Sequence, residues 1–182
     1  DLLERMRGIG LPQQLAARCE LMLARAYLSL DRIDDARGSL RRATIAGGET
    51  AAEAHAVLAD IAEATFDREH AAAELDTAIA SLIDLADDDR LGERDRLYKR
   101  AAQLAVNRAG LFDRSGQYAL ASEDYERAHM LAQVHAPELA GDAARTLLSR
   151  AVKDGNANTE RRWIDAVLAT RPPAEERAAL LV

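Results

Sequence analysis

A short helical pattern recurs three times in this chain: a small residue, a large residue four positions later, and a small residue three positions after that. The copies are Ala36/Leu40/Ala43, Ala71/Leu75/Ala78 and Ala121/Tyr125/Ala128. Residues spaced three and four apart share one face of an α-helix, so the large side chain of each copy lies between two small ones. Small side chains let a second helix approach closely. The pattern therefore predicts closely packed helix pairs that repeat along the chain.

Turn signals separate the segments that have helical periodicity. Gly116 supplies a permissive backbone just before the third copy, Gly47 and Gly48 indicate a helix end, and Pro172 and Pro173 indicate another. No segment has the alternation of a strand. We expect helices over residues 1–7, 11–30, 34–44, 51–65, 68–86, 93–112, 117–133, 137–152, 159–170 and 174–182.

The spacing of the copies is uneven. Ala36 and Ala71, which begin the first two copies, lie 35 positions apart, whereas Ala71 and Ala121 lie 50 apart. Residues 85–100 fill the excess with helical composition that only Gly92 interrupts. We therefore expect the two helices that flank Gly92 to be longer than the others, by about two turns each.

Composition supports an all-α fold and limits the kinds of partner. The apolar fraction is 48% and the aromatic fraction 4%, with alanine the commonest apolar residue, which is typical of packed helices rather than sheets. The net charge of -7 argues against direct binding to nucleic acid, which needs a basic stripe. The single cysteine, Cys19, suits a reducing cytosol. There is no run of 18 apolar residues and no signal pattern, so we expect a cytoplasmic protein without a membrane segment.

The residues that carry the repeat resemble a known family. Leu23, Ala24 and Tyr27 precede the first copy in the order that the tetratricopeptide repeat (TPR) shows, Leu58, Ala59 and Ala62 precede the second, and Ala109, Phe112 and Gly116 precede the third; Arg108 stands where that family usually has leucine. The unit of this family is a helix–turn–helix of 34 residues. The resemblance implies a right-handed α-α superhelix of stacked antiparallel helix pairs.

The resemblance also implies a division of the chain. We expect a single helical repeat domain over residues 1–182, with a cap over 1–16, about three repeat units over 17–135, and C-terminal helices over 136–182 that include Trp163 and could form a degenerate fourth unit. The chain opens at Asp1 without methionine and ends on Leu180-Leu181-Val182, and we expect it to be a piece of a larger protein. The apolar end leaves self-association open as a property of the array.

The family binds peptides or partner helices in a concave groove lined by the first helix of each pair. Carrying that property over assigns ten residues to the groove: Arg18, Leu21, Arg25, Ser29, Glu53, Asp60, Glu63, Gln103, Asn107 and Arg114. Such a groove is basic at one end and acidic in the middle, and arginine forks suit carboxylates. The alternative is that these residues form solvated helix faces. Leu21 and Arg25 do not match the Lys/Asn clamp that chaperone-binding members use, which disfavours binding of chaperone tails.

These features predict a scaffold or sensor module, not an enzyme, that binds a protein, a peptide or another domain of its own chain within a bacterial regulatory protein. The stretched spacing resembles the longer units of bacterial signal-transduction ATPases and transcription activators. A domain that senses a small ligand and controls a fused effector is the alternative. No cofactor is expected, because the sequence has no phosphate-binding loop, serine elbow or zinc-spaced cysteine pair.

A metal-dependent helical enzyme is the third hypothesis. Asp67 with His70, and Glu126 with His129, have the carboxylate-x-x-His spacing that places two ligands on one helix face. Against it, Asp67 falls in a turn, where its side chain is expected to cap the next helix. We expect Glu126 and His129 to lie on the outer side of their helix.

Structural roles explain the other residues whose side chains could take part in catalysis or metal binding. Cys19 and Trp163 are expected to pack in the core, and His55 and His135 to be exposed or partly buried without ligand partners. The acidic run at Asp84, Asp87, Asp88 and Asp89 lacks the spacing of a calcium loop and is expected to be a solvated helix end.

Overall fold

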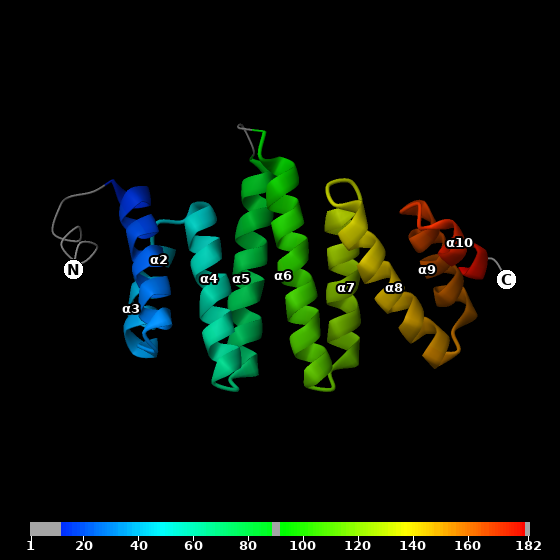
Figure 1. Ribbon diagram of the computed structural model, residues 1–182, viewed down its shortest axis with the longest axis horizontal. Helices are drawn as coiled ribbons and strands as arrows, with labels where there is room; N and C mark the ends of the chain where they lie inside the picture. The colour runs from blue at the N-terminus through cyan, green and yellow to red at the C-terminus, as the bar shows by residue number, and fades with distance from the viewer. Residues whose placement is uncertain (1–11, 89–91, 181–182) are drawn as a thin grey trace. The chain divides into compact units, whose positions relative to one another are not determined.

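A computed structural model describes residues 12–88 and 92–180, and its regular secondary structure there is entirely α-helical (Figure 1). The all-α prediction is thus confirmed. The helix expected over residues 1–7 lies outside the described residues. The helices are α2 (Gln13–Ser29), α3 (Ile33–Thr44), α4 (Gly48–Ala64), α5 (Arg68–Asp87), α6 (Arg94–Arg114), α7 (Tyr118–Ala132), α8 (Pro137–Asp154), α9 (Ala157–Ala169) and α10 (Ala174–Leu180).

The chain forms two compact units, Asp1–Asp88 and Asp89–Val182. In unit 1, α2 packs against α3, α3 against α4, and α4 against α5. In unit 2, α6 packs against α7, α7 against α8, and α8 against α9. Each unit is therefore a run of sequential antiparallel helices with its own packing.

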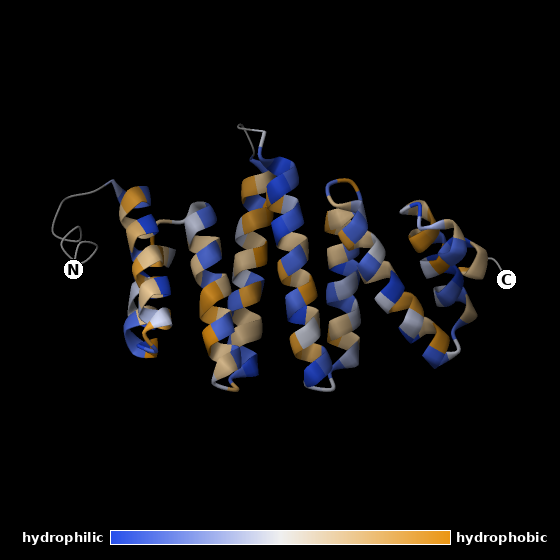
Figure 2. Cartoon of the chain, in the orientation of Figure 1, coloured by the Kyte–Doolittle hydropathy of each residue, from blue (hydrophilic) through white to orange (hydrophobic). Residues whose placement is uncertain are grey.

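The repeated small-large-small pattern forms the centre of each helix pair. In unit 1, Ala36, Leu40 and Ala43 have no exposed surface, and they pack with Leu23, Ala24 and Tyr27 of α2. Ala71, Leu75 and Ala78 are buried in the same way on α5. Figure 2 shows that hydrophobic and hydrophilic residues alternate along every helix, as expected for helices with one buried face. The predicted packing is confirmed for these pairs.

Unit 2 uses the same arrangement with one large aromatic addition. Ala121 and Ala128 are fully buried on α7, with the partly buried Tyr125 between them. Trp163 is 2% exposed and packs with Leu147 and Val167 in a cluster that joins α8 to α9, and Tyr125 and Leu180 lie against this cluster. The prediction that Trp163 is a core residue is confirmed.

Four turns share one hydrogen-bonding pattern. In each, the middle residue has a positive φ: 58° at Asp31, 61° at Phe66, 73° at Gly116 and 64° at Gly155. The next residue donates its backbone N–H to the carbonyl five positions earlier, over 2.9 to 3.1 Å, in the pairs Arg32–Tyr27, Asp67–Ala62, Gln117–Phe112 and Asn156–Ala151. This is the Schellman ending of a helix. Equivalent positions in the four helix pairs can therefore be found by counting from the residue with positive φ in each turn.

The uneven spacing is explained by helix length and by the number of residues between α5 and α6 together. α5 has 20 residues against 12 in α3, and α6 has 21 against 17 in α4. The extra length is about two turns in α5 but only about one turn in α6. The segment between Asp88 and Glu93 accounts for the remainder. The expected two extra turns are therefore confirmed for α5 and are an overestimate for α6.

Alanine substitutions at Gly116, which lies in a shared turn, and at Gly38, which lies inside a helix, test the turn assignment. A β-carbon on Gly116 meets no atom within 4 Å, so Gly116→Ala is expected to destabilise unit 2 by about 1–2 kcal/mol through the left-handed backbone alone. Gly38 lies inside α3, where its β-carbon would meet only the Arg42 side chain at 3.6 Å, so Gly38→Ala is expected to stabilise unit 1 by about 1 kcal/mol. Chemical denaturation of both variants measures this. Equal effects of the same sign would contradict the turn assignment.

Candidate functional site

An open pocket of ligand size is present in each unit. The pocket of unit 1 (the groove) has a volume of about 680 Å³ and lies between α2 and α4. It is lined by Pro12, Gln14, Leu15, Arg18, Leu21, Arg25, Glu49, Thr50 and Glu53. Arg18, Leu21 and Arg25 lie one turn apart along α2, which places them on one face of the helix. Glu49 and Glu53 are likewise one turn apart on α4.

Four of the residues assigned to a groove from the sequence are brought together here. Arg18, Leu21, Arg25 and Glu53 line the same pocket. Ser29, Asp60 and Glu63 are not part of its lining: Ser29 donates its hydroxyl to the Ala26 carbonyl at 2.8 Å, and Asp60 and Glu63 lie nearer the C-terminal end of α4. The sequence pattern did not identify Gln14, Leu15, Glu49 and Thr50, which lie one turn away from assigned residues.

The charges of the groove are partly matched within the protein. Arg25 donates from Nη2 to Glu53 Oε1 at 2.9 Å, joining α2 to α4 across the pocket, and both side chains remain accessible, at 56% and 30% exposure. Arg18 is exposed and makes no ion pair with the other described residues. Beside these charges, Leu15 is 44% exposed, whereas Leu21 is buried. The groove therefore combines an accessible guanidinium, an exposed ion pair and an apolar wall.

The three residues assigned in unit 2 lie together on one face of α6. Gln103, Asn107 and Arg114 are all exposed, and Gln103 donates its amide to Asn107 Oδ1 at 3.3 Å. They do not line the pocket of unit 2. Their role as partner-binding residues remains a prediction.

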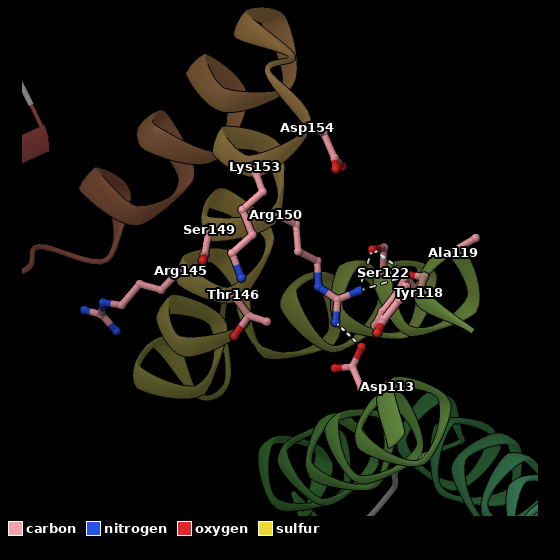
Figure 3. Close-up of a pocket in the computed structure, with 10 residues that line it drawn as sticks. All are labelled: Asp113, Tyr118, Ala119, Ser122, Arg145, Thr146, Ser149, Arg150, Lys153 and Asp154. Atoms are coloured by element: carbon pink, nitrogen blue, oxygen red, sulfur yellow. Dashed lines mark hydrogen bonds and ion pairs between the residues drawn. The ribbon is translucent and has the colours of Figure 1, made fainter. Parts of the chain in front are cut away.

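The pocket of unit 2 was not identified from the sequence. It has a volume of about 940 Å³ and is lined by Asp113 at the end of α6, by Tyr118, Ala119 and Ser122 of α7, and by Arg145, Thr146, Ser149, Arg150, Lys153 and Asp154 of α8 (Figure 3). Its lining comes from the packing of one helix pair on the next, which a pattern within one pair does not reveal. The available sequence signal for this pocket was Gly155, because it marks the end of α8 and so fixes how the residues of α8 are counted from the turn.

Arg150 fixes one wall of this pocket. It forms an ion pair with Asp113 and donates to Ser122 Oγ at 2.8 Å and to the Tyr118 carbonyl at 3.0 Å, so it connects α6, α7 and α8 (Figure 3). Its guanidinium also lies 5.0 Å from the centre of the Tyr125 ring. Burial, and then the neighbouring Asp113 carboxylate that accepts from its hydroxyl, raise the pKa of Tyr125.

Arg145 lines the opposite end of the pocket with its side chain directed to other carboxylates. It binds Glu176 of α10 through two hydrogen bonds of 2.6 and 3.2 Å, and Asp142 at 2.8 Å. The hydrogen bond from Arg145 lowers the pKa of Glu176. Arg145 thus tethers α10 to α8, and its positive charge is matched by the protein itself.

The structure gives no support to the metal hypothesis. Asp67 Oδ1 accepts the backbone N–H of His70 at 3.2 Å, which is the helix cap expected of it. The expected outward position of His129 is wrong: His129 is 6% exposed, its Nδ1 lies 2.9 Å from the Ala140 carbonyl, and its ring meets the edge of Trp163. Glu126 instead reaches Arg162. Within residues 12–88 and 92–180, no three His, Cys, Asp or Glu side chains are grouped to hold a metal ion.

The other singled-out residues fit structural roles. Cys19 is a buried free thiol. His55 contacts Glu74 at 2.5 Å, and His135 contacts Asp95 at 2.6 Å while stacking on Tyr98. Both histidines are partly buried as expected, but each has a carboxylate partner that the sequence did not indicate. Asp84, Asp87 and Asp88 are exposed at the end of α5, and Asp89 lies outside the described residues.

The antiparallel pairs, the shared turn and the buried small-large-small pattern define a TPR-like helical-repeat fold. The structure is similar to the crystal structure of MamA, a TPR-like protein, with a TM-score of 0.51 and 19% sequence identity over 90% of this chain and 81% of the MamA chain. This likeness confirms the predicted fold class. No protein-family model matches the chain, and no curated protein matches it. Among the described helices, none has both the length and the apolar character that a membrane crossing requires.

Proposed function

We propose that this chain is a protein-interaction module that binds a peptide segment of a partner in the groove of unit 1. The single observation that supports this most is the convergence of Arg18, Leu21, Arg25 and Glu53 on one pocket, because these four are among the ten residues that the family resemblance assigns to a groove. A rigid helical scaffold holds them at fixed spacing, so the receptor loses little conformational entropy on binding.

The chemistry of the groove favours a partner segment with a carboxylate beside an apolar residue. Arg18 offers a guanidinium that can bind a carboxylate through two parallel hydrogen bonds. Leu15, partly exposed at the same wall, suits an apolar neighbour. A second carboxylate of the ligand would compete with Glu53 for Arg25. An exposed ion pair of this kind contributes only about 0–1 kcal/mol, so replacing Glu53 as the partner of Arg25 costs little free energy.

The setting of this module is part of the same proposal. The partner is a separate protein or another domain of the same polypeptide, and the polypeptide is a cytoplasmic regulatory protein of bacteria. The support is the spacing of the repeats, which resembles that of the longer units in bacterial signal-transduction ATPases and transcription activators. The exposed pairing of Arg25 with Glu53 would then act as the resting state of the groove.

The groove is tested with peptides selected by display against the wild-type chain. The dissociation constant of a selected peptide is expected to rise at least tenfold in Arg18→Glu/Arg25→Glu and to fall severalfold in Glu53→Gln, because Glu53→Gln frees Arg25 from its internal partner. Arg41→Glu is the matched control, since Arg41 is an exposed arginine of α3 outside the groove. Unchanged affinity in the folded double variant, or an equal loss in Arg41→Glu, contradicts the proposal.

A further inference from the structure

The pocket of unit 2 contains one positive charge that the described part of the protein does not match. Asp113 is paired with Arg150, and Arg145 is paired with Glu176 and Asp142. The side chain of Lys153 has no ion pair or hydrogen bond with other described residues, although it lines the pocket. Its ammonium is therefore the charge available to a ligand on this side of the pocket.

The groups around Lys153 are hydrogen-bonding groups of one helix face. Thr146, Ser149 and Lys153 are spaced three and four apart on α8 and share one stripe. In Figure 3 the Lys153 ammonium lies on the same side of Arg150 as the Thr146 and Ser149 hydroxyls, whereas the Asp154 carboxylate lies farther from these hydroxyls. The Thr146 hydroxyl donates to the Asp142 carbonyl at 3.1 Å, so the Lys153 ammonium and the Ser149 hydroxyl are the donors of this stripe that remain for a carboxylate.

The opposite wall supplies an apolar surface and a rigid support. Tyr118 of α7 is 66% exposed and lines the pocket across from α8. Its backbone carbonyl accepts from Arg150, so the hydrogen bonds of Arg150 hold this wall to α8. The volume of about 940 Å³ lies at the upper end of the range of small-molecule sites and can hold several residues of an extended chain.

We propose that the pocket of unit 2 is a second binding site, and that it takes an acidic segment of a partner protein by placing a glutamate or aspartate carboxylate on Lys153 and Ser149, with Tyr118 against the neighbouring residue. The pocket is open rather than enclosed by the protein, which favours a chain segment over a free small molecule. This site is formed by unit 2 alone, and it does not depend on the groove of unit 1.

The test measures binding of a capped, fluorescein-labelled peptide rich in glutamate to the full chain. Lys153→Glu is expected to raise the dissociation constant at least tenfold, and Lys153→Arg to keep it within about threefold, because arginine retains the charge. Lys99→Glu is the matched control: Lys99 is the other lysine of the chain and lies on α6, outside the pocket. Circular dichroism verifies that each variant is folded.

Three results would overturn the proposal. The first is equal binding of a twin peptide in which glutamine replaces every glutamate. The second is an affinity that Lys153→Glu leaves unchanged or that Lys99→Glu lowers as much. The third is displacement of the peptide by free glutamate or inorganic phosphate at the same concentration, which would identify a site for small anions. All of these measurements are made in the Arg18→Glu/Arg25→Glu background, because the groove of unit 1 is itself proposed to take a carboxylate and would otherwise bind the same peptide.

Discussion

Removing Arg108 from the Arg108–Asp124 ion pair is expected to destabilise unit 2 by about 3–5 kcal/mol. Arg108 of α6 donates from Nε to Asp124 Oδ2 at 2.8 Å and from Nη2 to Oδ1 at 2.6 Å. The two side chains are only 13% and 5% exposed. Truncation of Arg108 leaves the Asp124 carboxylate buried without this counterion, and that desolvation penalty exceeds the value of the pair itself.

A double-mutant cycle separates this penalty from the net worth of the pair. Arg108→Leu introduces the residue that TPR sequences usually have at this position, yet alone it is expected to be severely destabilising because Asp124 remains. Arg108→Leu/Asp124→Ala is expected to recover most of the loss. Chemical denaturation followed by the fluorescence of Trp163, which lies in unit 2, measures each variant. A loss below about 1 kcal/mol in both single variants would show that water reaches these charges and that the pair is not buried.

The same pair shows where sequence reasoning reached its limit. The repeated pattern predicted the helix pairs and which faces are buried, because helical spacing of small and large residues depends only on local geometry. It also identified Arg108 as a departure from the family. It did not predict Asp124 as the partner, because that pairing depends on how α6 and α7 are rotated against each other.

The same limit applies to the two candidate sites: residues within one helix could be assigned from the sequence, whereas contacts between helix pairs could not. Arg18, Leu21 and Arg25 were assigned from the groove positions of the family that the chain resembles; they share one face of one helix, and they line one pocket. The ion pair between Arg25 and Glu53, which sets the charge of that pocket, joins two helix pairs and has no signal within either one. The pocket of unit 2 also lies between pairs, and so it had no signature within a single repeat.

The prediction that His129 lies on the outer side of α7 was wrong for a related reason. The carboxylate-x-x-His spacing is a local pattern, and it gave no information about which side of α7 faces α8 and α9. The structure places the His129 ring against Trp163 and its Nδ1 near the Ala140 carbonyl, so two contacts from later in the chain determine its burial. Whether a histidine next to an alanine of the buried pattern is itself buried can therefore be decided only when the position of the following helix pair is known.

Trp163→Ala is expected to destabilise unit 2 by about 3–5 kcal/mol, because it removes the largest fully buried side chain of the protein's described core. Trp163 packs with Leu147 and Val167, meets His129 edge to face with ring centroids 5.4 Å apart, and lies under the Arg162 guanidinium at 4.5 Å. Hydrogen exchange of the α8 and α9 amides measures the effect without a tryptophan signal. Val134→Ala, at an 82% exposed position, is the control and is expected to change little.

The reason for so large an effect lies in the register that Gly155 sets. Counted from the shared turn, the positions of the small-large-small pattern on α9 fall at Glu160, Ile164 and Val167, so this pair lacks the two alanines that let the other pairs pack closely. Trp163, one residue before Ile164, is the large buried side chain of this pair. Trp163→Phe is therefore expected to lose less than Trp163→Ala but more than Val134→Ala. If Trp163→Ala left the exchange of α8 and α9 unchanged, the tryptophan would not hold this pair together, and the pairing of α8 with α9 would have to rest on the remaining aliphatic contacts.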